Sequence, residues 1–484
     1  MKKQITISRH TRREFIKYGS LAVGGAVVTG PYILRGQNLN SKLNIAQIGT
    51  AGKGSSDAEC IFSNGQNISA LCDVNSSDLD AMKQSLINAK QPAPATYRDF
   101  RELLEKEKSL DAVDIAVPDH MHAVIAATAI KLGKHVYCQK PLTHDVFEAR
   151  TLREMARQYK VATQMGNQGS ASDTLRRAVE IVQAGVIGPI HTAYVWTNRP
   201  VWPQGLDRPP GADPVPAYLD WNLWLGTAPE RPYKGAWPDG KPPGIGGPNV
   251  YEPFNWRGWQ DYGTGALGDM ACHTVNWPFR SLKLGYPTEI EASSSGMNTE
   301  MYPTMSRIRF EFPEREGMPA VTLHWSDGGN KPPPEVTAGI VAMTGSLSNS
   351  GCLMIGEKGV IFSPDDGDQD LRTFIQMKGE SDMVGTPNHD AVKAIPETLV
   401  RNAHKGAPDQ RQHGEWIQAC KDGKHEVAYS NFDIAAYLTE IILLGCVALR
   451  VGKKLEWDGP GMQAKNAPEA AQFVKRVYRN GYSL

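Results

Sequence analysis

Residues 43–54 read Leu-Asn-Ile-Ala-Gln-Ile-Gly-Thr-Ala-Gly-Lys-Gly, and this stretch decides the fold of the first part of the chain. Leu43–Gly49 is typical of a short buried strand, and a helix is predicted from Ser55 to Phe62. The turn between them matches G-x-G-x-x-G except at Ala51, and Gly52 supplies some of the missing freedom. Such a turn brings the backbone close to a pyrophosphate at a helix N-terminus. Alone it is a weak signal, because glycine turns after strands are common.

The next predicted strand strengthens this interpretation. Ile68–Cys72 reads as a strand and is followed by Asp73, which lies 19 residues after Gly54. A carboxylate there accepts hydrogen bonds from a ribose 2′-OH and repels a 2′-phosphate, which favours NAD over NADP. The alternative role for Asp73 is a helix N-cap, which Asn75, Ser76 or Ser77 fills equally well.

Alternating strands and helices continue for about 120 residues. We expect a helix at Tyr97–Lys106, a strand at Ala112–Val117, a helix at Ala123–Leu132 and a strand at His135–Gln139. This alternation predicts an α/β domain with a doubly wound parallel sheet of the Rossmann type. His120 and His122 have the H-x-H spacing of metal ligands, but no third ligand is evident. We therefore predict no metal, and instead a cofactor contact or a helix cap in this loop.

Several motifs, in order along the chain, resemble the Gfo/Idh/MocA oxidoreductases. Val136–Leu142 (Val-Tyr-Cys-Gln-Lys-Pro-Leu) is similar to the Glu-Lys-Pro motif of that family. Thr163–Gly169 and the glycine-rich segment Gly263–His273 also resemble family segments, the latter leading to Asp-x-x-x-His. The resemblance covers about residues 43–200, 255–290 and 410–458. It implies NAD-dependent oxidation or reduction of a sugar or polyol, and the export signal described below implies that the cofactor is held tightly.

The resemblance assigns the catalytic roles to Lys140, Asp269 and His273. Lys140 follows the carboxyl end of a predicted strand, where its ammonium can polarise a hydroxyl. Asp269 and His273 are four residues apart and share one helix face, so the histidine can accept a proton while the aspartate orients it. Gln139 departs from the usual Glu, and Asn276 from an Asp that often follows the histidine. The predicted cofactor contacts are Gly49, Thr50, Ala51, Gly52, Lys53, Gly54, Asp73, Pro118, His122, Gln139, Lys140 and Asn167.

The middle of the chain is rich in tryptophan and proline. Eight of the eleven tryptophans lie between positions 196 and 277. Tryptophan faces stack on sugar rings, but they also pack long loops or subunit contacts, and for a single tryptophan packing is the better expectation. The predicted substrate contacts are Asn198, Arg199, Asn255, Trp256, Arg257, Trp259, Tyr262 and His273.

The domain organisation is predicted from these patterns. The Rossmann domain spans 43–165 and a substrate-binding and oligomerisation domain spans 166–458, with a loop insertion at about 197–262 and a tail at 459–484. Strands at Glu289–Ser294, Ser306–Phe312 and Ala320–Ser326 predict a large, mostly antiparallel open sheet in an α+β domain. The resemblance implies a homodimer or homotetramer formed through that sheet. Residues 335–390 show no clear periodicity of apolar residues.

The N-terminus resembles a twin-arginine export signal. Thr11-Arg12-Arg13-Glu14-Phe15-Ile16-Lys17 is followed by a short apolar stretch, and residues 1–30 are assigned to the signal. The interpretation implies the twin-arginine translocase as a partner and a periplasmic location, where free NAD is scarce. A short basic amphipathic helix is the alternative.

Composition excludes several classes of protein. Lys+Arg and Asp+Glu are both 52, so no basic excess exists to bind nucleic acid. The seven cysteines are odd in number and form no CxxC, which favours buried free thiols over disulfides or zinc.

Three functions are compatible with these patterns. The leading one is an exported NAD-dependent oxidoreductase acting on a secondary alcohol of a sugar or glycoside, such as the alcohol at ring C3, with NADP as a less favoured cofactor. The second is an NAD-dependent glycosidase that oxidises C3 transiently and eliminates the aglycone. The third is a sugar-binding protein without catalysis.

Overall fold

The computed structural model describes residues 42–238, 245–479 and 481–484. Its first sheet has six parallel strands in the order β3-β2-β1-β4-β5-β6. The strands are β1 Asn44–Ile48, β2 Asn67–Cys72, β3 Ala95–Tyr97, β4 Ala112–Ile115, β5 His135–Cys138 and β6 Thr163–Met165. The strand order reverses between β1 and β4, which is where ligands bind in open α/β sheets. The predicted doubly wound Rossmann sheet is confirmed.

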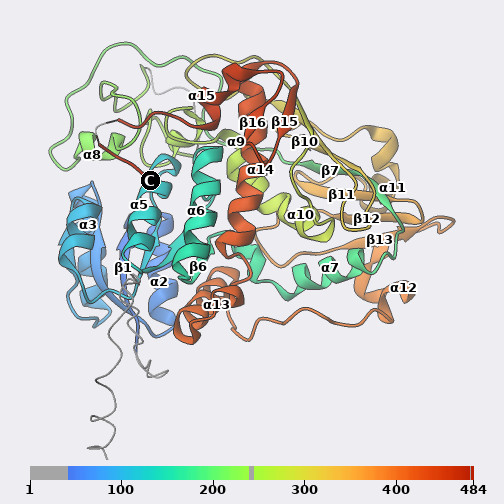
Figure 1. Cartoon of the computed structure of the whole chain (residues 1–484), viewed down its shortest axis with the longest axis horizontal. Helices are drawn as coiled ribbons and strands as arrows, with labels where there is room; N and C mark the ends of the chain where they lie inside the picture. Colours follow the sequence, from blue (N-terminus) through green and yellow to red (C-terminus); the bar gives the residue numbers. More distant parts are fainter. Residues whose placement is uncertain (1–41, 239–244, 480) are drawn as a thin grey trace, which may run out of the picture. The chain divides into compact units, whose positions relative to one another are not determined.

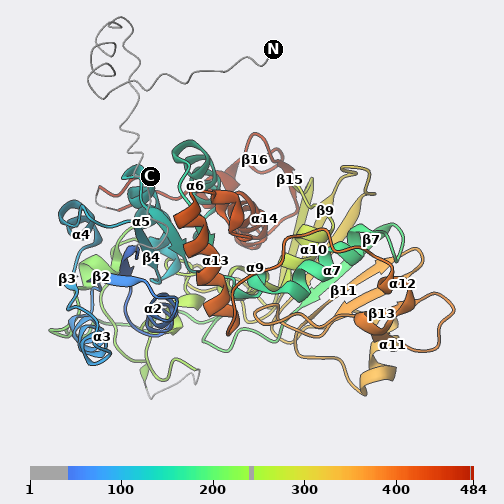
Figure 2. The same ribbon diagram turned by 90° about the horizontal axis from the view of Figure 1, so that it is seen from below.

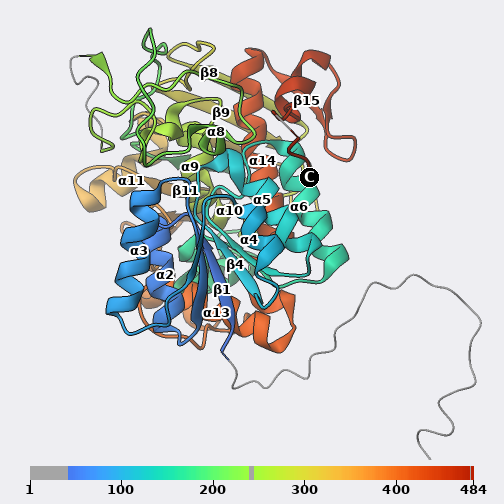
Figure 3. The same cartoon turned by 90° about the vertical axis from the view of Figure 1, so that its left-hand side faces the viewer.

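Helices cover both faces of this sheet (Figure 3). On one face lie α2 and α3, and on the other lie α4, α5 and α6. Their bounds are α2 Lys53–Ser63, α3 Ser76–Asn88, α4 Phe100–Lys106, α5 Asp119–Lys131 and α6 Val146–Tyr159. The helix expected from Tyr97 begins later, because Tyr97 pairs with Cys72 in the sheet and Asp99 caps the helix.

The second sheet has ten strands in the order β14-β13-β12-β11-β7-β10-β9-β8-β15-β16 (Figure 1). Only the pairing of β7 with β10 is parallel, so the expected mostly antiparallel sheet is confirmed. The strands are β7 Ile190–Trp196, β8 Glu289–Ser294, β9 Ser306–Phe312, β10 Val321–Ser326, β11 Gly351–Gly356, β12 Gly359–Ser363, β13 Phe374–Met377, β14 Val384–Gly385, β15 Leu455–Asp458 and β16 Gln463–Ala464.

The segment 335–390, which showed no period, therefore supplies strands β11–β14 and helix α11 Pro334–Thr344 to this sheet. The other elements of the second part are η1 Gln168–Ala171, α7 Asp173–Gln183, α8 Trp221–Leu225, η3 Asn255–Gly258, α9 Gly265–Thr274, α10 Asn276–Ser281, η4 Thr386–Asn388, α12 Asp390–Lys393, α13 Pro408–Asp422, η5 His425–Val427, α14 Phe432–Val451, η6 Pro468–Ala470 and α15 Ala471–Val474.

Helix α14 joins the two sheets. It contacts α6 beside the first sheet, and α9 and β8 beside the second (Figure 1). Among the described residues α14 alone is long and apolar enough to cross a membrane, yet 78% of its most apolar window is buried in the structure. Its apolar character is therefore explained by its place in the core.

The tryptophan-rich insertion has little regular structure. Between residues 197 and 262, and outside the undescribed residues 239–244, it contains only α8 and η3 as helices. It is held by its own core of aromatic rings in edge-to-face and tilted contacts, which includes Trp224, Tyr251, Trp259 and Tyr262. The C-terminal tail ends near α5 (Figure 2) and is likewise packed, because Arg476 forms ion pairs with Asp145 and Glu148 of the first domain.

All seven cysteines lie in the described part of the chain, and each is buried and free. The expectation of free thiols is confirmed. The twin-arginine segment lies outside the described residues, and the predicted domain boundaries stay predictions.

Candidate active site

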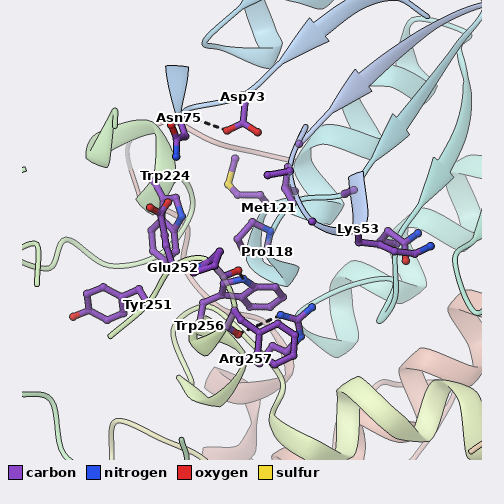
Figure 4. Close-up of a pocket in the computed structure, with 18 of the residues that line it drawn as sticks. Lys53, Asp73, Asn75, Pro118, Met121, Trp224, Tyr251, Glu252, Trp256 and Arg257 are labelled. Atoms are coloured by element: carbon purple, nitrogen blue, oxygen red, sulfur yellow. Dashed lines mark hydrogen bonds between the residues drawn. The ribbon is translucent and has the colours of Figure 1, made fainter. Parts of the chain in front are cut away.

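A cavity of about 980 Å³ lies at the carboxyl ends of the first sheet's strands. Its wall combines the glycine-rich turn and the ends of β2, β4 and β5 with side chains from the insertion and from α9 (Figure 4). Asp73 and Asn75 lie near one end, and Trp256 and Arg257 lie near the other. This volume is at the upper end of the range for small-molecule sites.

The glycine-rich turn has the geometry that a dinucleotide requires. Gly49 has φ +86°, and a Cβ there would lie 2.3 Å from the Ala116 carbonyl oxygen. A Cβ on Gly54 would lie 2.0 Å from the Gly49 carbonyl oxygen, so only glycine lets α2 approach β1 this closely. No side chain caps the N-terminus of α2, which begins at the cavity wall. The turn therefore fits a pyrophosphate.

Asp73 lies on the cavity wall and is fixed by the turn. One of its oxygens accepts hydrogen bonds from the backbone N–H and the hydroxyl of Thr50, at 2.8 and 2.9 Å. Burial raises the pKa of Asp73, although these hydrogen bonds oppose the change. The alternative role for Asp73, a helix N-cap, is taken by Asn75. The Asn75 side chain accepts hydrogen bonds from the backbone N–H groups of Ser77 and Asp78. Asp73 is thus available for a ribose.

Gln139 and Lys53 meet a buried charge network behind the turn. The Gln139 amide donates to Asp57 at 2.7 Å, and the Lys53 ammonium lies 2.9 Å from the same carboxylate. His413 lies 3.2 Å from Asp114, and its neighbouring carboxylates hold its pKa well above its usual value despite burial. Asp57, Asp114 and His413 offer ligand-type atoms within 4.8 Å of one another. Because Lys53 and charged His413 balance the two carboxylates, the group is explained without a metal.

Lys140 and Arg257 converge on one oxygen of Asp269. The Lys140 Nζ lies 3.0 Å from Asp269 Oδ1, and the Arg257 Nε donates to the same oxygen at 3.1 Å. Burial acts to raise the pKa of Asp269, but the two cations outweigh it and the net pKa is lowered. The cluster carries one positive charge in excess, at the end of the cavity opposite Asp73.

His273 also lines the cavity, one helical turn after Asp269 on α9. Burial, and then the Lys140 charge, lower the pKa of His273 to about 3, so the ring is neutral near pH 7. Its Nδ1 atom is buried without a hydrogen-bond partner in the described structure. Asp269 was expected to orient this ring, but its hydrogen bonds go to Lys140 and Arg257 instead.

Three predicted cofactor contacts have structural roles instead. Both nitrogens of His122 lie 2.8 Å from backbone carbonyl oxygens, those of Pro141 and Val117. The Asn167 amide donates to the Cys272 carbonyl oxygen, which ties α9 to the segment that follows β6. Gly54 packs against Gly49, as described above. None of the three is part of the cavity wall, whereas the other predicted cofactor contacts are.

The predicted substrate contacts divide in the same way. Arg199, Trp256, Arg257 and His273 line the cavity. Trp259 and Tyr262 are fully buried in the aromatic core of the insertion, where their large apolar area stabilises the loops. Asn198 accepts a hydrogen bond from Arg199, and Asn255 donates to backbone carbonyl oxygens of its own loop, so neither faces the cavity.

Sequence reasoning missed several residues of the wall. Four of them belong to the insertion, where residue type alone does not distinguish a cavity residue from a packing residue. They are Trp202, Trp224, Tyr251 and Glu252. Asp368 comes from the segment that showed no period. Its loop is brought to the site by Gly367, where a Cβ would lie 2.6 Å from the His273 carbonyl oxygen. No local signal predicts such a contact.

Comparison with known proteins supports the cofactor. Residues 43–167 match the Gfo/Idh/MocA model, described as an oxidoreductase family with an NAD-binding Rossmann fold. The prediction of NAD as the cofactor is thereby confirmed for this domain. The glycine turn and Asp73 are the residues that would hold it.

Two curated relatives match a part of the chain. Glycosyl hydrolase family 109 protein 1 of Shewanella sp. (strain MR-4) is 29% identical over 143 residues, 28% of this chain and 31% of that protein. Levoglucosan dehydrogenase of Pseudarthrobacter phenanthrenivorans is 28% identical over 92 residues, 19% of this chain and 23% of that protein. The chain matches less than a third of the length of either relative.

The fold extends further than the sequence similarity. An inositol dehydrogenase homolog from Azotobacter vinelandii, solved in complex with NAD+, superposes with a TM-score of 0.59. The alignment covers 87% of this chain and 99% of that one, at 14% identity. At this identity the comparison shows a shared two-part fold.

Proposed function

We propose that the protein is an NAD-dependent oxidoreductase that acts on a secondary alcohol of a sugar or glycoside. The observation that carries the proposal is the placement of the Lys140–Asp269–Arg257 cluster and neutral His273 in the same cavity as the glycine turn and Asp73. The partial relative named levoglucosan dehydrogenase supports a sugar alcohol as the substrate class.

The cluster supplies electrostatic stabilisation to the reacting oxygen. Oxidation of an alcohol builds negative charge on oxygen as the O–H proton leaves, and a bound nicotinamide accepts the hydride from carbon. Lys140 and Arg257 share one carboxylate, so their excess positive charge favours an alkoxide beside them. Asp269 fixes both cations through a single oxygen, and it stays ionised because its pKa is lowered.

His273 is the group that accepts the proton. It lines the cavity, and it is neutral at pH 7 because burial and the Lys140 charge lower its pKa. The Asp269 charge acts on His273 in the direction that favours its protonated form, opposing Lys140. Trp256, which stacks under Arg257 at 4.4 Å, presents an aromatic face on the same wall for a sugar ring.

A glycosidase is the second candidate, favoured by the partial relative named glycosyl hydrolase family 109 protein 1. In that reaction the C3 alcohol loses a hydride and a proton, and the resulting ketone acidifies the hydrogen on C2. Loss of that proton expels the aglycone, water adds, and the hydride returns to C3. The sum is hydrolysis with no net oxidation, so the two candidates share their first step.

One experiment separates the candidates. Purified protein is denatured to quantify released NAD(H) and NADP(H), and native protein is incubated with a panel of sugars and p-nitrophenyl glycosides. A keto-sugar product with reduced cofactor supports the oxidoreductase. Nitrophenol release without net reduction supports the glycosidase, and the absence of any nucleotide binding would leave a sugar-binding protein.

Export and assembly are part of the proposal. The Thr-Arg-Arg-Glu-Phe-Ile-Lys motif at residues 11–17 supports export by the twin-arginine translocase to the periplasm. Fractionation of cells that express the chain with Arg12 and Arg13 changed to Lys tests this, because export should be lost. The open ten-stranded sheet supports a homodimer or homotetramer, which light scattering on purified protein tests.

A further inference from the structure

The insertion is fastened to the first domain at the rim of the cofactor site. Leu219 forms a backbone bridge with Asn75, just after β2. On either side, the Ser76 N–H donates to the Tyr218 carbonyl oxygen at 2.8 Å, and the Asp220 N–H donates to the Val74 carbonyl oxygen at 3.0 Å. These bonds join the insertion to the loop that carries Asp73, although the two lie about 145 residues apart in the chain.

Arg98 reinforces the same junction. Its guanidinium donates to the carbonyl oxygens of Val74 and Tyr218, one from each side. Arg98 also lines the cavity, and its positive charge acts to lower the pKa of Asp73. An arginine at this place can accommodate the 2′-phosphate of NADP. Here one of its nitrogens, Nη2, donates to both carbonyl oxygens, so the guanidinium is fixed at the junction between the insertion and the first domain.

The docked insertion brings a carboxylate of its own to the cavity. Glu252 lies on the wall with Trp224 and Tyr251, all three carried by the insertion, whereas Asp73 and Asn75 come from the first domain (Figure 4). No hydrogen bond or ion pair reaches the Glu252 carboxylate from any residue that the structure describes. Burial, and then the charges of Asp73 and Asp78, raise the pKa of Glu252 to about 7. Glu252 therefore lines the same cavity as Asp73, and it is carried there by the insertion that docks beside the Asp73 loop.

We propose that Glu252 is a cofactor-specificity residue, which accepts a ribose hydroxyl of NAD together with Asp73 and disfavours the 2′-phosphate of NADP. The proposal rests on the proposed function, since it needs NAD in this cavity. Above its pKa of about 7, ionised Glu252 adds to the repulsion that Asp73 exerts on a phosphate dianion, so the binding measurements below are made at pH 8. The insertion is then a part of the cofactor site as well as of the substrate site.

The test measures nucleotide binding and needs no turnover. Full-length protein, stripped of nucleotide with charcoal, is titrated with NADH and with NADPH while tryptophan fluorescence is followed. In Glu252→Gln the ratio Kd(NADPH)/Kd(NADH) should fall at least tenfold, with NADH affinity changed less than about fivefold. Glu230→Gln is the matched control, because Glu230 is exposed on the same insertion and is absent from the cavity wall.

A charge-retaining variant shows whether the change in the ratio comes from the lost charge or from a loss of structure. Glu252→Asp should keep the ratio within about threefold of the wild type, and circular dichroism should show that all variants are folded. An unchanged ratio in folded Glu252→Gln, or an equal fall in Glu230→Gln, would overturn the proposal. If Glu252→Gln does not fold, a fall of the ratio in Glu252→Asp to the tenfold level would overturn it as well. Wild-type protein that binds neither nucleotide would instead refute the proposed function.

Discussion

Asp269→Asn is the sharpest test of the site, because it removes one charge and keeps the shape of the side chain. In the wild type, one Asp269 oxygen holds the Lys140 ammonium at 3.0 Å and the Arg257 guanidinium at 3.1 Å. The Asp269 side chain is 7% exposed, and each cation is 19% exposed. The variant would leave two like charges close together and poorly solvated.

The structure sets the size of the effect. Removing one partner of a buried ion pair costs about 3–5 kcal/mol, and the partial exposure of both cations to the cavity places this case near 3 kcal/mol. Turnover should fall by about 10²–10³, as when a donor to a developing oxyanion is displaced. NADH affinity should change less than about threefold, because Asp73 lies at the other end of the cavity.

The pH dependence follows from the lowered pKa of Asp269. A carboxyl whose pKa is lower in the folded state stabilises the protein above the unfolded pKa, which is about 3.9. That contribution is lost as the pH falls through the folded pKa. The difference in unfolding free energy between the wild type and Asp269→Asn should therefore have its full size at pH 5 to 6, well below the pKa of about 8 that burial and the Asp269 charge give to Asp119. It should shrink at pH values below about 4.

The assay combines urea denaturation at several pH values with turnover on the best sugar and titration with NADH. Asp390→Asn is the matched control, since Asp390 also binds a lysine but is 93% exposed, and this change should leave stability and turnover as they are. If Asp269→Asn unfolds within 1 kcal/mol of the wild type and keeps turnover within tenfold, the shared-carboxylate cluster has no role in stability or catalysis.

Three further predictions follow from single features. Gly54→Ala should weaken NADH binding at least tenfold in titrations, since the new Cβ would lie 2.0 Å from the Gly49 carbonyl oxygen, and Ser55→Ala should not. His413→Asn should lower the unfolding free energy most below pH 6.5, because a histidine with a raised pKa stabilises the folded state there. This stabilisation disappears as the pH rises through the pKa of the folded state. Urea denaturation at pH 6 and pH 9 tests this, and a larger loss at pH 9 would contradict it. Trp256→Ala should raise the KM for the sugar at least tenfold with NADH affinity retained, whereas an unchanged KM would remove Trp256 from the substrate site.

Local patterns predicted the first domain well. The alternation of strand and helix between residues 43 and 165 implied the parallel sheet that the structure has, because each period reflects which faces an element buries. Glycine spacing located the turn, and the spacing of Asp269 and His273 placed them on one helix. The segment 335–390 escaped prediction because its central strands β11 and β12 are buried on both faces for most of their length, and such strands show no alternation of apolar and polar residues.

Spacing did not predict which partners the site residues choose. Asp269 was expected to orient His273, four residues away, but the tertiary structure brings Lys140 and Arg257 to its carboxylate. Two cations attract a carboxylate more strongly than a neutral imidazole ring does. Trp259 and Trp256 cannot be told apart by residue type, yet Trp259 lies in the core and Trp256 lines the cavity.

The sequence by itself thus determined the Rossmann sheet, the cofactor turn and the residues able to do the chemistry, because these depend on contacts within a few residues or on a regular period. Only the tertiary structure decided that Glu252 shares a cavity with Asp73 and that Asp368 reaches the wall beside His273. Both residues sit on loops, whose positions are set by hydrogen bonds and close packing between distant segments, and such contacts leave no periodic trace in the sequence.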